Sequence, residues 1–172
     1  MLENEMLETE AFSISRDLKA PRALVYEVQT DAKHLANWLS PEGFKTTHAD
    51  MDFRVGGRYH YCQEGPGGLE LWGLQRFREI VPNEKIVLIQ SFSDKDGGLT
   101  RNPMAPEWPL EMLARTTFED IGRGMTRITI SWRPYNSDEA GIRAFDAGRA
   151  SMTGGFGGVF KKLEAYLAQL QG

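Results

Sequence analysis

Residue types that bind metals or activate nucleophiles are concentrated between positions 48 and 64 of the sequence. They occupy alternating positions along two short runs: His48, Asp50, Asp52, His60, Cys62 and Glu64. A hairpin that turns at Val55-Gly56-Gly57 would bring all six to one face, because side chains two residues apart on a strand point the same way. Metal binding on a sheet face is therefore the first chemistry to consider.

The spacing of these residues does not match a metal site. A structural zinc site uses four Cys or His ligands in closely spaced pairs, which this segment lacks. Antiparallel sheets commonly have one solvated face with cross-strand polar pairs. We interpret the six residues as such a polar outer face, with His60 opposite Asp52 and Cys62 opposite Asp50, and we predict no metal site.

Side-chain sets for covalent or acid–base catalysis are sparse. The sequence contains no GxSxG, HExxH or CxxC motif and no kinase motif set. His60 and Cys62 would stand parallel on one strand rather than converge as a dyad. The ionisable candidates for a cavity are His34, Arg76 and Glu111, and we interpret Arg76 and Arg78 as solvated residues of the outer face. We assign no catalytic residue and no cofactor.

The spacing of apolar residues predicts an α+β fold. Residues 12–19 alternate as a first strand, Pro21 opens a short helix, and Asp31 caps a second one. After Pro134 the period returns to 3.6 and predicts a long terminal helix. Turn-rich connections make neighbouring strands antiparallel, so seven strands would form a sheet covered by that helix. A period of two predicts six of these strands near 44–53, 57–63, 69–80, 84–92, 110–119 and 125–133.

The terminal helix contains a stretch of glycine that weakens it. Gly154, Gly155, Gly157 and Gly158 lie inside the predicted helix, where each costs about 1 kcal/mol relative to alanine. One explanation is that the helix breaks, kinks or packs closely against the sheet at this point. The other, which can hold at the same time, is that a ligand cavity lies beneath the glycines.

The predicted cavity lies between this helix and an apolar, aromatic sheet face. In the third long strand the alternation slips between Leu74 and Phe77, which predicts a bulge near Gln75. The long loop 94–109 would act as a lid. The predicted ligand-binding residues come from the inner sheet face, the lid and the glycine-rich helix segment: Trp38, Phe53, Tyr59, Tyr61, Trp72, Leu74, Leu88, Trp108, Met112, Ile130, Trp132, Met152, Gly155, Phe156 and Val159.

Composition narrows the class of protein. With 20 Lys and Arg against 24 Asp and Glu, the net charge of −4 argues against nucleic-acid binding and against a polybasic membrane anchor. The single cysteine excludes a disulfide framework and fits a reducing compartment. We predict a flexible acidic N-terminus over residues 1–11, a single domain over 12–172 and a cytoplasmic location, with no membrane span. Monomer and homodimer both remain open.

Five segments, in order, resemble the activator of heat shock protein 90 ATPase homologue family, which belongs to the START-like (SRPBCC, Bet v 1-like) superfamily. The resemblance covers residues 12–170, and the 91–112 segment, with its long loop, resembles a bacterial subgroup. The terminal helix has Gly155-Phe156 where family members commonly show Gly-Trp. The five segments are KAPRALVYEVQTDAKHLANW (19–38), SPEGF (40–44), DFRVGGRYHY (52–61), FREIVPNEKI (77–86) and residues 91–112 (SFSD, then RNPMAPEWPLEM from 101).

The resemblance implies a helix-grip fold, in which a curved antiparallel sheet wraps around a long C-terminal helix with a hydrophobic cavity between them. The superfamily includes lipid and hormone binders, co-chaperone domains and aromatase/cyclases. Three functions follow as expectations: binding of an apolar or aromatic small molecule, a co-chaperone-like module that stimulates a heat shock protein 90 type ATPase, and a cofactor-independent cyclase or hydrolase. The partner would accordingly be a small molecule or a chaperone.

Overall fold

A computed structural model describes residues 9–172 of the chain. Residues 1–8, most of the predicted acidic N-terminus, lie outside the described residues. The elements run in the order β1 (Phe12–Leu18), α2 (Arg22–Thr30), α3 (Ala32–Trp38), β2 (Lys45–Met51), β3 (Arg58–Glu64), the 3-10 turn η1 (Pro66–Gly68), β4 (Glu70–Val81), β5 (Lys85–Ser93), β6 (Leu99–Thr100), β7 (Glu111–Gly122), β8 (Met125–Tyr135), α4 (Glu139–Ala147) and α5 (Arg149–Gln171).

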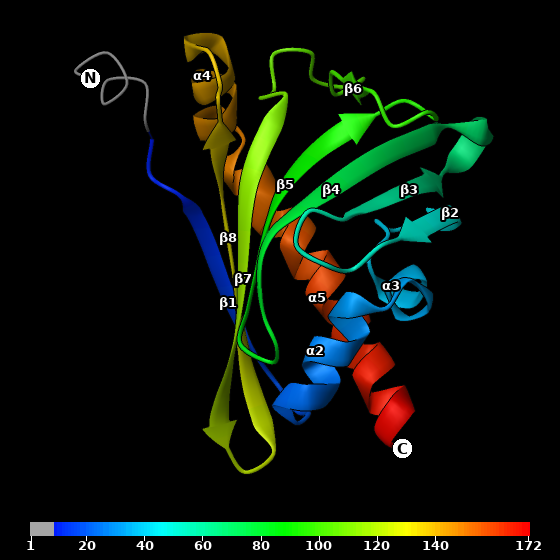
Figure 1. The fold of residues 1–172 in the computed structure, drawn as a ribbon, viewed down its shortest axis with the longest axis vertical. Helices are drawn as coiled ribbons and strands as arrows, with labels where there is room; N and C mark the ends of the chain where they lie inside the picture. Colours follow the sequence, from blue (N-terminus) through cyan, green and yellow to red (C-terminus); the bar gives the residue numbers. More distant parts are fainter. Residues whose placement is uncertain (1–8) are drawn as a thin grey trace.

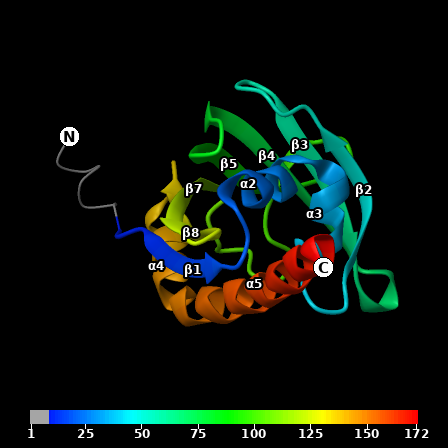
Figure 2. The ribbon, with the colours of Figure 1, turned by 90° about the horizontal axis from the view of Figure 1, so that it is seen from below.

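The strands form one antiparallel sheet in the order β1-β8-β7-β5-β4-β3-β2, as Figure 1 shows. The two-residue strand β6 pairs with β5 beside this path and was not predicted. The sheet curves around α5, while α2 and α3 cover the end at which α5 finishes (Figure 2). The predicted α+β architecture, with two short helices after the first strand, is confirmed.

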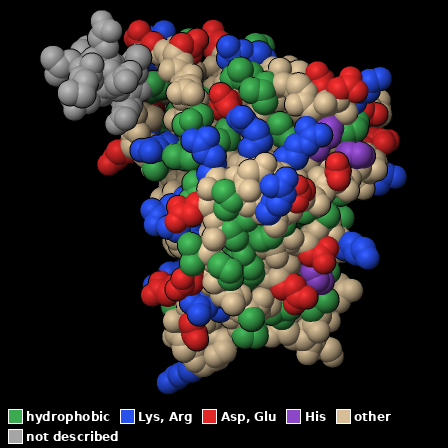
Figure 3. Space-filling view, viewed as in Figure 1, with side chains coloured by type: hydrophobic (Ala, Val, Ile, Leu, Met, Phe, Trp, Pro, Cys, Tyr) green, Lys and Arg blue, Asp and Glu red, His purple; other side chains and the backbone are tan. Residues whose placement is uncertain are grey.

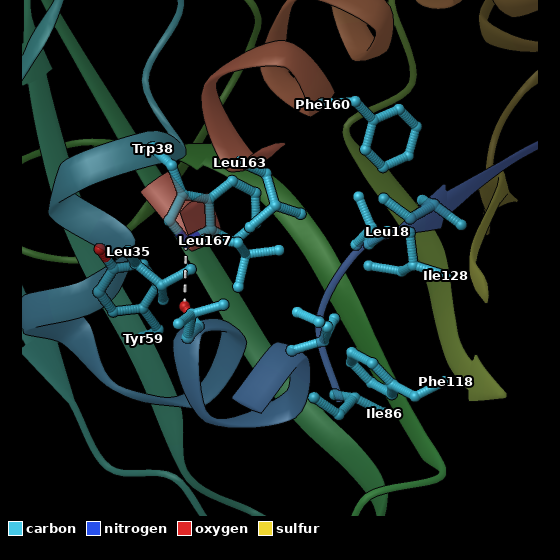
Figure 4. Packing of buried hydrophobic residues seen from close by; sticks show 14 of the residues in the cluster. Leu18, Leu35, Trp38, Tyr59, Ile86, Phe118, Ile128, Phe160, Leu163 and Leu167 are labelled. Carbon is cyan, nitrogen blue, oxygen red and sulfur yellow. Dashed lines mark hydrogen bonds between the residues drawn. The ribbon is translucent and has the colours of Figure 1, made fainter. Parts of the chain in front are cut away.

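The two short helices begin where the sequence predicts. Pro21 precedes α2, and the Asp31 side chain accepts a hydrogen bond from the Lys33 N–H at 2.8 Å at the start of α3. The indole of Trp38 is 1% exposed and donates to the Val28 carbonyl at 3.0 Å (Figure 4). This bond ties α3 to α2, so the pair packs as one unit against the core.

The C-terminal segment is divided into two helices rather than forming one. Asp138 caps α4 by accepting from the Gly141 N–H at 2.8 Å. The chain turns at Gly148, where a Cβ atom would lie 2.8 Å from the Trp108 ring. Helix α5 then runs unbroken through all four glycines to Gln171.

The buried apolar side chains form two clusters. The larger one packs the second half of α5, with Phe160, Leu163 and Leu167, against the sheet and the two short helices (Figure 4). The smaller one lies near α4 and contains Phe12, Met112, Phe145 and Met152. No helix in the described part of the chain is long and apolar enough to cross a membrane.

The facing of β4 differs from the prediction. Its bulge lies between Phe77 and Glu79 instead of near Gln75. Gly73 pairs with Tyr61, so Gly73 and Gln75 share the concave face with Tyr61. Trp72 and Leu74 consequently lie on the convex face, opposite to the face predicted for them.

The β2–β3 hairpin is also offset from the predicted register by two residues. Asp50 pairs with His60, and His48 pairs with Cys62. In this register the Asp52 N–H donates to the Arg58 carbonyl at 2.8 Å, so these two residues lie opposite each other at the start of the turn. A shift of two residues keeps each side chain on its predicted face.

The convex face is less solvated than predicted. His60 and Cys62 are only 4% and 2% exposed, because the Trp72 ring stacks on His60 with centroids 5.1 Å apart. The His60 Nε2 atom lies 3.0 Å from the Asp94 carbonyl oxygen. Figure 3 shows this face, with histidines near one edge and a band of basic side chains over β4, β5 and β7.

Candidate ligand-binding cavity

A cavity of about 610 Å³ lies between the concave sheet face and the first half of α5. Apolar and aromatic side chains make most of its wall. Residues of both core clusters border it, so it lies between the two. Its volume is in the range of sites that hold drug-sized molecules, about 300–1,000 Å³. The apolar wall residues include Trp38, Leu71, Phe77, Ile86, Leu88, Met112, Ile130, Trp132, Met152, Phe156 and Val159.

The glycines of α5 face open space. Apart from the adjacent residues and the backbone of the helix itself, no atom lies within 4 Å of the position that a Cβ would take at Gly154, Gly155, Gly157 or Gly158. The unbroken helix and these empty surroundings contradict the explanations of a helix break and of close packing. Gly154, Gly155 and Gly158 border the cavity, and Gly157 does not. Gly154, Gly155 and Gly158 are also exposed, so this part of the helix lies at the mouth of the cavity, open to solvent.

All but three of the predicted ligand-binding residues border the cavity. Phe53 and Tyr59 belong to the main core cluster instead, and Leu74 lies on the convex face. Trp72 is a bordering residue, but its indole stacks on His60 on the convex side. The residues that do border it are Trp38, Tyr61, Trp72, Leu88, Trp108, Met112, Ile130, Trp132, Met152, Gly155, Phe156 and Val159.

Three polar side chains on the concave face form a chain of hydrogen bonds that the sequence did not predict. Gln75 Nε2 donates to Gln90 Oε1 at 2.9 Å, and Gln90 Nε2 donates to the Tyr61 hydroxyl at 2.9 Å. We call these three residues the polar relay. A polar residue at an inward position looks like a solvated one in the sequence, which is why the two glutamines were missed.

Gly73 makes room for the ring of Tyr61. A Cβ at Gly73 would lie 2.3 Å from both Cζ and the hydroxyl oxygen of Tyr61, so any other residue would push the ring away. Burial raises the pKa of the Tyr61 phenol, and the hydrogen bond from Gln90 opposes this shift. The side chain is therefore a neutral phenol at physiological pH.

The ionisable residues considered for catalysis do not border the cavity. His34 Nδ1 lies 2.6 Å from the Tyr166 hydroxyl, on the side of α3 toward α5. Arg76 and Glu111 form an ion pair on the convex face. The guanidinium of Arg78 lies 5.5 Å from the centre of the Tyr135 ring. Both arginines thus face outward, as we had interpreted them.

The long loop after β5 meets the cavity at its α4 end. Asn102, Met104, Trp108 and Pro109 border the cavity, and the Trp108 ring packs on Phe145 with centroids 5.8 Å apart. The Met104 side chain is 68% exposed. At the opposite end, Lys162 Nζ donates to the Ser40 carbonyl at 2.6 Å and so joins α5 to the segment after α3.

The family model of the "Activator of Hsp90 ATPase homolog 1-like protein" matches residues 19–168. A search of the curated proteins found no match. Solved structures share the fold. One is a protein from Arthrobacter aurescens, with TM-score 0.75, 23% identity and coverage of 94% of this chain and 91% of that one. Another is the AHSA1 protein from Silicibacter pomeroyi, with TM-score 0.68, 18% identity and coverage of 93% and 99%.

Proposed function

The chain belongs to the activator of Hsp90 ATPase homolog 1-like protein family, and we propose that it binds a small apolar or aromatic molecule between α5 and the sheet. The observation that carries this proposal is the glycine stretch of α5. Four helical glycines weaken the helix by about 3–4 kcal/mol relative to alanine. Since no neighbour outside the helix approaches them within 4 Å, packing does not offset this loss, and three of the four glycines border the cavity.

The wall chemistry supports the same proposal. Apolar surface leaving water contributes about 25 cal/mol per Å², and the aromatic rings around the cavity offer flat faces to an aromatic ligand. Phe156 stands over the cavity from the helix side and Trp132 from the sheet side, with ring centroids 5.1 Å apart. A flat apolar molecule beside this edge-to-face pair would be enclosed by both layers.

A titration with N-phenyl-1-naphthylamine tests the proposal. This neutral probe fluoresces in apolar surroundings, and we expect saturable binding with one probe per chain. Gly155→Leu should weaken binding by at least ten-fold, because its side chain enters the cavity. The matched control is Gly157→Leu, in the same helix but away from the cavity, which should bind as the unaltered protein does. Equal affinity in both variants would refute the proposal.

Family membership favours a second candidate, a co-chaperone-like role toward a heat shock protein 90 type ATPase. The direct assay is the ATPase rate of a bacterial chaperone of that type with and without this chain. A rate that rises and then saturates with added chain would support this role. No change in rate, together with no complex at high micromolar concentration, would rule against it. The cyclase or hydrolase alternative has no support from its candidate groups, because His34, Arg76 and Glu111 do not border the cavity.

A further inference from the structure

We propose that the cavity selects uncharged ligands that carry a hydrogen-bond acceptor, such as a ketone oxygen, and that the Tyr61 hydroxyl donates to this acceptor. This inference rests on the proposed function of small-molecule binding. It adds the chemical class of the ligand and the residue that recognises it.

The direction of the relay follows from its neighbours. Gln90 Nε2 lies 3.5 Å from the Ser91 carbonyl oxygen, which accepts hydrogen bonds and never donates them. This contact identifies the atom as the amide nitrogen, so Gln90 donates to the Tyr61 oxygen and presents its own oxygen to Gln75. Both glutamine bonds therefore point in one sense, toward Tyr61.

Tyr61 is the last member of the relay and keeps a donor. A hydroxyl that accepts one hydrogen bond still has its own proton to donate. Within residues 9–172, no side chain or carbonyl takes that proton. Tyr61 borders the cavity, and the absence of a side chain at Gly73 lets its ring lie along the wall. Tyr61 is partly buried, and a ligand acceptor in the cavity would take the hydrogen bond that this hydroxyl otherwise gives to water.

The wall around the relay carries no charge. Of the described residues that border the cavity, only Glu42 and Lys162 have acidic or basic side chains. Glu42 is exposed, and Lys162 already donates to the Ser40 carbonyl. An anion or cation placed beside Tyr61 would lose its hydration without gaining a partner of opposite charge. A neutral acceptor can take the hydrogen bond from Tyr61 and needs no partner of opposite charge.

The test compares probes that differ in one feature, measured by displacement of N-phenyl-1-naphthylamine from the full chain. Benzophenone and diphenylmethane share two rings, and only the former has an oxygen. We expect benzophenone to bind about three- to ten-fold more tightly, the effect of one hydrogen bond to a neutral group. The anion 4-benzoylbenzoate should bind at least ten-fold more weakly than benzophenone.

Variants assign the preference to the relay. Tyr61→Phe should abolish the preference for benzophenone over diphenylmethane. Thr116→Val, which removes another hydroxyl at the cavity wall, is the matched control and should keep the preference. In the unaltered protein, the carbonyl stretching band of bound benzophenone should shift to lower wavenumber. This measurement stands even if Tyr61→Phe fails to fold.

The outcomes separate the inference from the function on which it rests. If both neutral probes bind equally well, or if Tyr61→Phe keeps the preference, the inference is overturned and the binding function stands. If 4-benzoylbenzoate binds as tightly as benzophenone, the uncharged class is overturned. If N-phenyl-1-naphthylamine itself does not bind, the proposed function fails and the inference fails with it.

Discussion

Replacing the four glycines of α5 by alanine is expected to stabilise the protein and to weaken its binding of apolar molecules. Each added methyl group meets no atom within 4 Å, so steric strain does not oppose the change. Alanine exceeds glycine by about 0.8–1.0 kcal/mol in a helix interior, so the four changes should add about 3–4 kcal/mol. For a domain of this size, the melting temperature would rise by roughly 6–16 °C.

The assay pairs thermal unfolding, followed by circular dichroism, with the titration of N-phenyl-1-naphthylamine. The quadruple variant should melt higher and bind the probe more weakly, because three of the four changes add a methyl group at residues that border the cavity. Gly157→Ala alone should raise the melting temperature by about 2–4 °C and leave binding unchanged. An unchanged or lowered melting temperature in the quadruple variant would refute the reasoning about open space. A higher melting temperature with undiminished binding would refute the link to the cavity.

Three further predictions concern single residues. Thr126 donates to the Ala20 carbonyl at 2.7 Å, both residues being fully buried, so Thr126→Val should lower the free energy of unfolding in urea by about 1–3 kcal/mol. Backbone N–H groups of Gly98 and Asp96 lower the pKa of Asp94, so its stabilising effect is present above the unfolded value of 3.8 and is lost as the pH falls below it. Asp94→Asn should therefore flatten the acid limb of a stability–pH curve; an unaltered limb would contradict this. Burial raises the pKa of the Cys62 thiol, which should react slowly with iodoacetamide at pH 8 until urea unfolds the chain, and fast native labelling would contradict this.

Most of the architecture could be predicted from the sequence because the two-residue period of the strands and the 3.6-residue period of the helices each extend over long segments. The strands from β2 to β8 lie within three residues of their predicted bounds, apart from the added β6. Asp31 and Asp138 mark the starts of α3 and α4, as their capping chemistry indicates. The division between α4 and α5 at Gly148 was missed, and the close approach of the Trp108 ring there comes from a residue that is distant in the sequence.

The candidate site was harder to predict because the side-chain facing of a strand is assigned on the rule that apolar residues point inward and polar residues outward. The polar residues of the site do not follow this rule. Gln75 and Gln90 face inward, and this makes the alternation in β4 and β5 ambiguous. Placing the bulge near Gln75 sent Leu74 to the wrong face, whereas the bulge after Phe77 keeps the glutamine inside. The β2–β3 register was wrong for a different reason: a shift of two residues preserves every facing, so hydrophobic pattern alone does not detect it.

The division of the core into two clusters has a consequence for cooperativity. The cluster of Phe12, Met112, Phe145 and Met152 and the main cluster share only the partly buried Ile14, Trp132 and Phe156 at their boundary, among the described residues. The cavity separates the two clusters, so the α4 end can open as a local unit while α2, α3 and the end of α5 stay folded. A ligand that touches both clusters would join them into one cooperative unit, so occupancy would change how the molecule unfolds as well as how stable it is.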